Sequence, residues 1–174
     1  MALAAFGLKN WIDEHRHLLK PPVGNQCMFA DKDFIVMIVG GPNARKDFHI
    51  NETEEFFYQI EGDITLRIRE DGKVRDIPIR EGEVFMLPAN IPHSPQRPAN
   101  TVGMVVERQR PAGMKDHVRF YCEACDEVVK DYTFDLTDIV NQLKSIMESY
   151  WSDEQARTCK KCGAVMRKPA AVPA

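Results

Sequence analysis

Two histidines and one glutamate in this 174-residue chain have the types and spacing that could hold a divalent metal ion. His49 and Glu55 are separated by an even number of positions, which places two side chains on one face of an extended strand. His93 follows much later, after a proline-containing corner. Two neutral imidazoles and one carboxylate form a face that leaves coordination positions open for a substrate and for oxygen. We therefore predict that His49, Glu55 and His93 bind one catalytic metal ion.

A structural role is the alternative for each of these residues taken alone. A single histidine beside an apolar strand more often belongs to the fold than to a metal site. The glutamate favours the metal, because an inward carboxylate at the start of the strand-forming stretch 55–60 is costly unless a cation neutralises it. Glu54, one position earlier, is expected to point to the opposite face.

Short strands joined by tight turns are expected to position these residues. Apolar and β-branched runs, some alternating with polar residues, predict strands at 34–39, 64–69, 74–79, 84–87 and 102–107. Asp71-Gly72 is a hairpin turn signal between the second and third of them. Such strands at this spacing are typical of a double-sheet jelly roll. A helix from Trp11 to about Leu19, capped by Asn10, is expected before them.

Two CxxC pairs in the last third of the chain predict a second metal site. Cys122 with Cys125, and Cys159 with Cys162, would supply four thiolates for zinc or iron. Disulfides are the alternative, and the lack of an export signal disfavours them. Between the pairs, the sequence predicts a strand at 127–134 and a helix that starts at an Asp135 cap.

Composition and charge limit the class of protein. The chain is 44% apolar and 28% charged, as is usual for a globular domain. A net charge of −3 argues against a nucleic-acid partner, which would usually require a basic stripe. No apolar run approaches the length needed to span a membrane, and no basic region precedes the apolar start. We expect a cytoplasmic protein with no nucleic-acid and no membrane partner.

Two blocks resemble the motifs of the cupin barrels. The first motif is matched by His49, Asn51, Glu55 and Gly62, and the second by Gly82, Pro88, Asn90 and His93. Asn51 replaces one histidine of the usual ligand set, so three ligands remain. The resemblance implies a mainly β fold, a cupin jelly-roll β-barrel, here with a small C-terminal CxxC/CxxC metal ribbon and a helix. A cupin fold alone names no reaction.

A narrower resemblance covers roughly Trp11 to Gly163. The blocks GGPNARKDFH, EEFFYQIEGD, LPANIPHSPQRP and VVERQRPAG resemble bacterial 3-hydroxyanthranilate 3,4-dioxygenases. That family opens the ring of 3-hydroxyanthranilate with O2 and gives 2-amino-3-carboxymuconate semialdehyde, the precursor of quinolinate in the kynurenine pathway. The resemblance implies Fe(II) as the catalytic metal. It also implies a rubredoxin-like site with a second Fe (or Zn) at the cysteines, remote from catalysis.

The same resemblance implies that Arg45, Arg97 and Glu107, together with Glu55, bind the substrate. An arginine fork suits the carboxylate of an aminobenzoate. Arg45 lies four positions before His49 and would share its face in an extended chain. Taken singly, each of these residues could instead lie on a solvated rim. Arg108 and Arg110 are nearby and are assigned structural roles.

The predicted organisation has three parts. Residues 1–115 are expected to form the catalytic barrel with its N-terminal helix, 116–168 the metal-binding segment with one helix, and 169–174 a disordered tail. A homodimer is expected, because cupins commonly pair through edge strands. Two other functions remain open. One is a metal-dependent cupin isomerase or epimerase that consumes no O2, and the other is a non-enzymatic cupin binding module.

Overall fold

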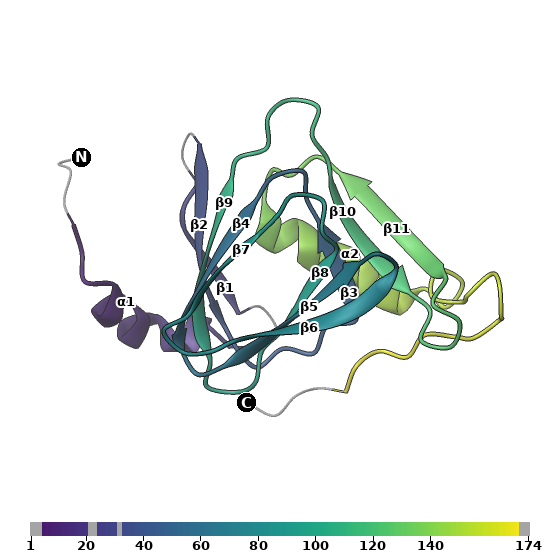
Figure 1. The fold of residues 1–174 in the computed structure, drawn as a ribbon, viewed down its shortest axis with the longest axis horizontal. Coiled ribbons are helices and arrows are strands. Elements are labelled where there is room, and N and C mark those ends of the chain that lie inside the picture. The colour runs from purple at the N-terminus through teal and green to yellow at the C-terminus, as the bar shows by residue number, and fades with distance from the viewer. Residues whose placement is uncertain (1–4, 21–23, 31–32, 171–174) are drawn as a thin grey trace.

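Two antiparallel sheets face each other and enclose an interior (Figure 1). The computed structural model describes residues 5–20, 24–30 and 33–170, so residues 171–174 of the predicted disordered tail lie outside the described part. The mainly β fold with two facing sheets is confirmed. No helix in the described ranges is long and apolar enough to cross a membrane.

The first sheet, sheet A, contains five strands among the described residues. Its order is β1 (Asn25–Phe29), β2 (Phe34–Gly40), β9 (Val102–Arg108), β4 (Glu55–Glu61) and β7 (Val84–Leu87). The second, sheet B, contains six. Its order is β11 (Val128–Phe134), β10 (Asp116–Tyr121), β3 (Asp47–Ile50), β8 (His93–Gln96), β5 (Ile64–Glu70) and β6 (Lys73–Ile79).

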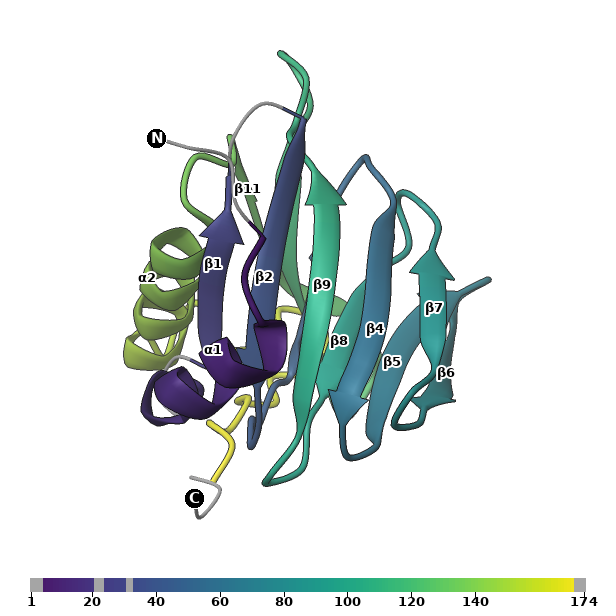
Figure 2. The same cartoon turned by 90° about the vertical axis from the view of Figure 1, so that its left-hand side faces the viewer.

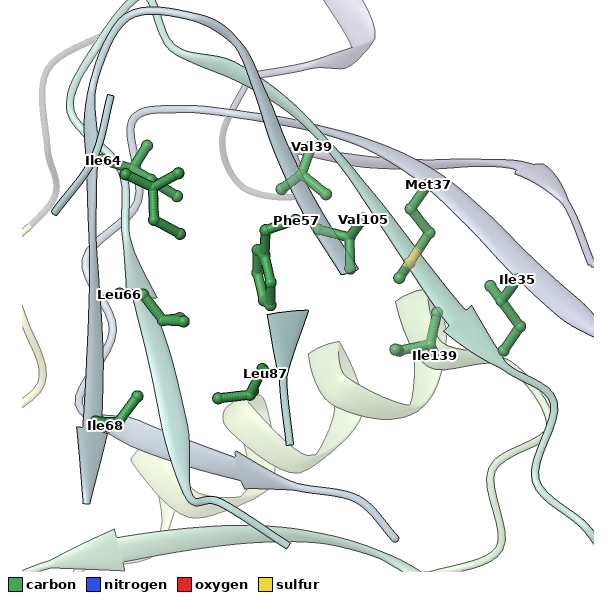
Figure 3. Close-up of a cluster of buried hydrophobic side chains, with 11 residues drawn as sticks. Ile35, Met37, Val39, Phe57, Ile64, Leu66, Ile68, Leu87, Val105 and Ile139 are labelled. Carbon is green, nitrogen blue, oxygen red and sulfur yellow. The ribbon is translucent and has the colours of Figure 1, made fainter. Parts of the chain in front are cut away.

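Alternation along the strands builds the core between the sheets. Ile64, Leu66 and Ile68 of β5 are buried, as their spacing predicts, and they face Phe57 and other apolar side chains of sheet A (Figure 3). The predicted hairpin turn is also present. Asp71 and Gly72 both have positive φ, as the tight turns that match the twist of two paired strands require.

The N-terminal helix lies on the outer face of sheet A. Helix α1 (Leu8–His15) continues as the 3-10 turn η1 (Arg16–Leu18) and packs Ile12 against Ile38 and Val102. The predicted start at Trp11 is wrong. The helix begins at Leu8 because the Trp11 N–H already donates to the carbonyl of Gly7, at 3.0 Å.

The C-terminal helix lies beside β1 (Figure 2) and packs against Phe120 of β10. Helix α2 (Ile139–Ser152) gives Ile139 to the barrel core and Tyr150 to a second cluster, where its ring stacks on Phe120 at 3.5 Å. The predicted cap at Asp135 is wrong. Asp138 caps the helix by accepting from the Asn141 N–H, which leaves Asp135 free to pair with Lys115.

Sheet B continues across the predicted division between residues 115 and 116. β10 is the first strand after that point, and it pairs with β3, with Val118 opposite His49. β11 then pairs with β10 at the edge of the same sheet. The segment that carries the cysteines therefore contributes two strands to the barrel.

Candidate active site

The predicted metal ligands meet in the barrel interior. His49 on β3 is directly opposite His93 on β8, and Glu55 begins β4 in the facing sheet. Glu55 Oε1 is 3.1 Å from His93 Nε2 and 3.5 Å from His49 Nδ1. All three side chains are buried, and their candidate ligand atoms lie within 4.8 Å of one another.

The reason that His49 and Glu55 converge differs from the predicted one. The chain between them does not stay extended, because β3 ends at Ile50 and β4 starts at Glu55 in the other sheet. The two residues meet across the barrel, where both sheets point side chains inward. Glu54 is exposed, as predicted.

Hydrogen bonds orient the two imidazoles for metal binding. His93 Nδ1 donates to the Ile91 carbonyl at 3.0 Å, and His49 Nε2 donates to Asp116 at 2.7 Å. In the neutral ring, the second nitrogen of each histidine therefore turns an electron pair toward Glu55. Among the described residues, nothing makes a hydrogen bond to Glu55 Oε1. Three buried donor atoms without a hydrogen bond between them fit a metal ion.

Electrostatics also favour a cation at this position. Burial alone would lower the pKa of His49, but the hydrogen bond to Asp116 and the nearby Glu55 carboxylate outweigh it and raise the pKa to about 9. Burial would raise the pKa of Glu55, yet His93 and His49 hold it well below its ordinary value. The site therefore stabilises a positive charge beside an ionised carboxylate.

A buried chain of charges continues from His49 to Glu107. Asp116, which His49 contacts, accepts from Arg110 Nε at 2.7 Å and from Arg110 Nη2 at 2.8 Å. Arg110 Nη2 also donates to Glu107 at 2.7 Å. Asp116 was not predicted, since a single aspartate at the start of a strand carries no signal. Arg110, to which a structural role was assigned, links a predicted metal ligand to a predicted substrate residue.

Glu107 itself is buried next to the predicted metal ligands. It is the register partner of Glu55 on the neighbouring strand of sheet A. Burial raises the pKa of Glu107 to about 7, and the nearby Glu55 carboxylate adds to this effect. Glu107 can therefore exchange a proton near neutral pH.

A cavity of about 480 Å³ opens onto these residues. That volume is within the usual range for small-molecule sites. Phe57, Met37 and Val105 give it apolar walls, while Arg45 and Arg97 add positive charge. Residues of α2 and residues 168–170 also line it. The predicted substrate residues thus share one cavity with the predicted metal ligands.

The two arginines of the cavity differ in their partners. Arg45 is paired through Nε and Nη2 with the carboxylate of Asp47. Arg97 is 3% exposed and donates from Nη1 to the neutral Oε1 of Gln59 at 3.3 Å. Within the described part of the chain, no carboxylate pairs with it. Burial lowers the pKa of Arg97 to about 10, and Arg45 adds to that shift, so Arg97 remains a buried cation at neutral pH.

The four cysteines gather at a second site. The Sγ atoms of Cys122 and Cys162, and those of Cys125 and Cys159, are 3.6 Å apart, far longer than a disulfide bond. All four candidate sulfur ligands lie within 4.8 Å of one another, as a tetrathiolate metal site requires. The backbone N–H of Cys162 helps to lower the pKa of Cys159 to about 7, which favours the thiolate.

Each CxxC pair sits on the same kind of turn. The N–H of Cys122 donates to Glu127 O, and the N–H of Cys159 donates to Ala164 O, both at 2.8 Å. The fourth residue after the first cysteine donates back to that cysteine's carbonyl in both turns, and it has positive φ in both. Asp126 and Gly163 occupy these positions. Two matching turns present their sulfurs to one point.

The chain is similar to known proteins over most of its length. The family model described as 3-hydroxyanthranilic acid dioxygenase matches residues 1–151. A protein from Neurospora crassa named 3-hydroxyanthranilate 3,4-dioxygenase is 52% identical over 95% of this chain and 91% of its own. One of the same name from Jannaschia sp. (strain CCS1) is 49% identical over 94% and 91%.

Among solved structures, a cupin-2 domain protein from Shewanella frigidimarina aligns with 59% of this chain and 99% of its own, at 17% identity and a TM-score of 0.46. The predicted resemblance to 3-hydroxyanthranilate 3,4-dioxygenases is confirmed by the family model and by the relatives. It is not limited to bacterial enzymes, since Neurospora crassa is a fungus. The chain belongs to the 3-hydroxyanthranilic acid dioxygenase family.

Proposed function

We propose that this protein is an Fe(II)-dependent dioxygenase that opens the ring of 3-hydroxyanthranilate with O2 to give 2-amino-3-carboxymuconate semialdehyde. One observation carries the proposal. The buried Arg97 guanidinium, which pairs with no carboxylate among the described residues, shares a cavity with the three predicted metal ligands His49, Glu55 and His93. The substrate has the complementary groups, since its carboxylate suits the guanidinium and its hydroxyl and amine suit a metal.

The residues of the cavity are proposed to have different roles in the reaction. His49, Glu55 and His93 would hold iron, which when bound supplies the path for electrons between the aromatic ring and O2. Arg97 binds the substrate carboxylate and sets the orientation of the ring. Glu107 accepts a proton from a polar group of the substrate, because its pKa of about 7 suits that exchange.

Arg45 supports the same carboxylate in a different way. Its charge is balanced by Asp47, so it adds hydrogen-bond donors to the cavity without adding much net charge. The apolar walls, such as Phe57 and Val105, exclude water and strengthen these polar contacts.

The cysteine site is proposed to hold a second Fe (or Zn). Four thiolates at tetrahedral spacing suit either metal, and the site lies in a separate apolar cluster with Tyr150 and Phe120. Its role is to stabilise the C-terminal segment. Four free thiols are typical of a reducing compartment, which supports a cytoplasmic location.

A homodimer is proposed through the outer face of sheet A. Val84 and Met86 on the edge strand β7 are 60% and 57% exposed. They are register partners of Tyr58 and Phe56 on β4, so the apolar surface continues inward from the edge. Large apolar patches are uncommon on the surfaces of monomers. Sedimentation of the wild type should show a dimer, and Met86→Glu should shift it toward the monomer.

Anaerobic loading with Fe(II) followed by addition of 3-hydroxyanthranilate and O2 tests the reaction. We expect one O2 consumed for each ring opened, measured together with an oxygen electrode and by absorbance. Loss of substrate absorbance without O2 uptake would instead indicate an isomerase. Binding of the substrate without any reaction, despite full iron loading, would contradict the proposed function.

A further inference from the structure

Gln59 is the only side chain that holds the Arg97 guanidinium by a hydrogen bond among the described residues. It lies on β4, on the same strand as Glu55, and its side chain is 1% exposed. A glutamine is an unusual residue in a barrel interior unless both ends of its amide are used. Here Oε1 accepts from Arg97 and Nε2 donates to the carbonyl of Glu61, at 2.8 Å.

The contact with Glu61 determines which end of the amide faces the arginine. A backbone carbonyl can only accept, so Gln59 must turn its NH2 group toward Glu61 and its oxygen toward Arg97. The reverse orientation would place NH2 groups against the guanidinium and an oxygen against the Glu61 carbonyl. The position of the acceptor for Arg97 is therefore fixed by the backbone of β4.

Gly103 leaves space for the Gln59 and Arg97 side chains because it has no side chain of its own. Gly103 lies on β9 beside β4, opposite Gln59 in the register. A Cβ at Gly103 would lie 2.7 Å from Gln59 Oε1 and 2.9 Å from Arg97 Nη1. Both distances are shorter than real carbon contacts, so any other residue here would displace the glutamine or the guanidinium.

The neutrality of Gln59 has a consequence for binding. A carboxylate at the same position would form an ion pair with Arg97 and neutralise the charge of the guanidinium, as Asp47 does for Arg45. An amide oxygen directs the guanidinium but leaves its charge for an incoming anion. Arg97 Nε has no hydrogen-bond partner within the described residues. The guanidinium is therefore oriented by Gln59 but keeps a donor for a ligand.

We propose that Gln59, oriented by Glu61 and accommodated by Gly103, is a positioning residue that aims Arg97 without neutralising it, and so sets the selectivity for ring substrates that carry a carboxylate. This inference rests on the proposed function, because it needs Arg97 to bind the substrate carboxylate. Gln59 touches no reacting group. It acts through Arg97 alone.

Two substitutions at Gln59 separate charge from shape. Gln59→Glu places a carboxylate against Arg97, whereas Gln59→Met keeps the length and removes the acceptor. Dissociation constants are measured by anaerobic calorimetry on iron-loaded protein, with 3-hydroxyanthranilate and with 2-aminophenol, which lacks the carboxylate. Gln155→Glu makes the same charge change at an exposed position and is the matched control. Iron content and thermal unfolding of each variant are recorded alongside.

We expect the Gln59 variants to lose affinity for 3-hydroxyanthranilate but not for 2-aminophenol. Gln59→Glu should weaken 3-hydroxyanthranilate binding by about 30-fold or more, because the substrate carboxylate loses its charged partner. Gln59→Met should weaken it by about 2- to 10-fold, the usual effect of one neutral hydrogen bond. Binding of 2-aminophenol should change by less than about 3-fold in both, and Gln155→Glu should leave both ligands unaffected.

The results distinguish a failure of the positioning role of Gln59 from a failure of the proposed function. If wild-type protein prefers 3-hydroxyanthranilate but the Gln59 variants keep that preference, or lose both ligands equally, the positioning role is wrong and the proposed function stands. If the wild type binds both ligands equally well, Arg97 does not bind the carboxylate and both proposals fail. If Gln59→Glu does not fold, Gln59→Met and Gly103→Ala test the positioning role instead. Each must weaken the binding of 3-hydroxyanthranilate more than the binding of 2-aminophenol.

Discussion

Replacing Asp116 by asparagine tests whether the buried contacts of Asp116 with His49 and Arg110 hold the predicted metal ligands in place. Asp116 is fully buried, and it accepts one hydrogen bond from His49 and two from Arg110. Asparagine keeps the shape but removes the charge and presents an NH2 group to one of these donors. Among the described residues, Arg110 would then keep only Glu107 as a carboxylate partner.

The size of the effect follows from these contacts. Removing one partner of a buried, hydrogen-bonded ion pair costs about 3–5 kcal/mol in the free energy of unfolding. For a chain of this length, each kcal/mol corresponds to roughly 2–4 °C, so the melting temperature should fall by about 6–20 °C. The His49 ring also loses the carboxylate that orients it. Changes of this kind typically weaken metal binding by about 10- to 100-fold.

Thermal unfolding of the metal-free protein and the rate of iron release to a chelator measure the two effects separately. Asp76→Asn is the matched control, because Asp76 also makes two hydrogen bonds to one arginine, Arg67, but both side chains are more than 40% exposed. Such a surface pair contributes about 0–1 kcal/mol. If Asp116→Asn melts and releases iron like Asp76→Asn, the buried chain of charges does not support the site.

Three further substitutions test the remaining assignments. Alanine at His49, Glu55 or His93 should abolish ring opening while the barrel stays folded by circular dichroism, and near-normal turnover by iron-loaded Glu55→Ala would disprove the ligand set. Cys159→Ser should lose the second metal, by elemental analysis, and some thermal stability, because metal binding at such sites contributes on the order of 10 kcal/mol in small zinc peptides. Its ring opening should largely remain, and a fully iron-loaded but inactive variant would contradict that. Arg97→Ala should damage 3-hydroxyanthranilate turnover about 30-fold or more while sparing any 2-aminophenol turnover, and equal losses would assign Arg97 to the fold.

Residue types and local spacing were sufficient to predict several of the strands and to single out three candidate ligands that the fold brings together. The alternation of β5 and the Asp71-Gly72 turn are local properties, and both are present. The convergence of His49 and Glu55 was predicted from one extended strand, but it arises from two strands in different sheets. Only the tertiary fold could show that, because the even spacing fits both arrangements.

The residues that support the site were not predictable in the same way. Asp116 and Gln59 act through contacts with partners 67 and 38 positions away in the chain. No periodicity or motif marks such pairs before the sheets are assembled. The helix caps failed for a different reason. Helix α1 begins after Gly7 without a side-chain cap, and two aspartates precede α2, of which Asp138 accepts from the Asn141 N–H while Asp135 pairs with Lys115.

The position of β10 has a consequence for how this protein can be divided. β3 carries His49, and β10 covers one hydrogen-bonding edge of β3 along its whole length. A chain ending at residue 115 would leave that edge bare, and an unpaired edge next to an apolar interior is a template for association with other chains. It would also lack Asp116. The segment that carries the cysteines therefore cannot be removed as a separate unit, because its first strand covers the strand that carries His49.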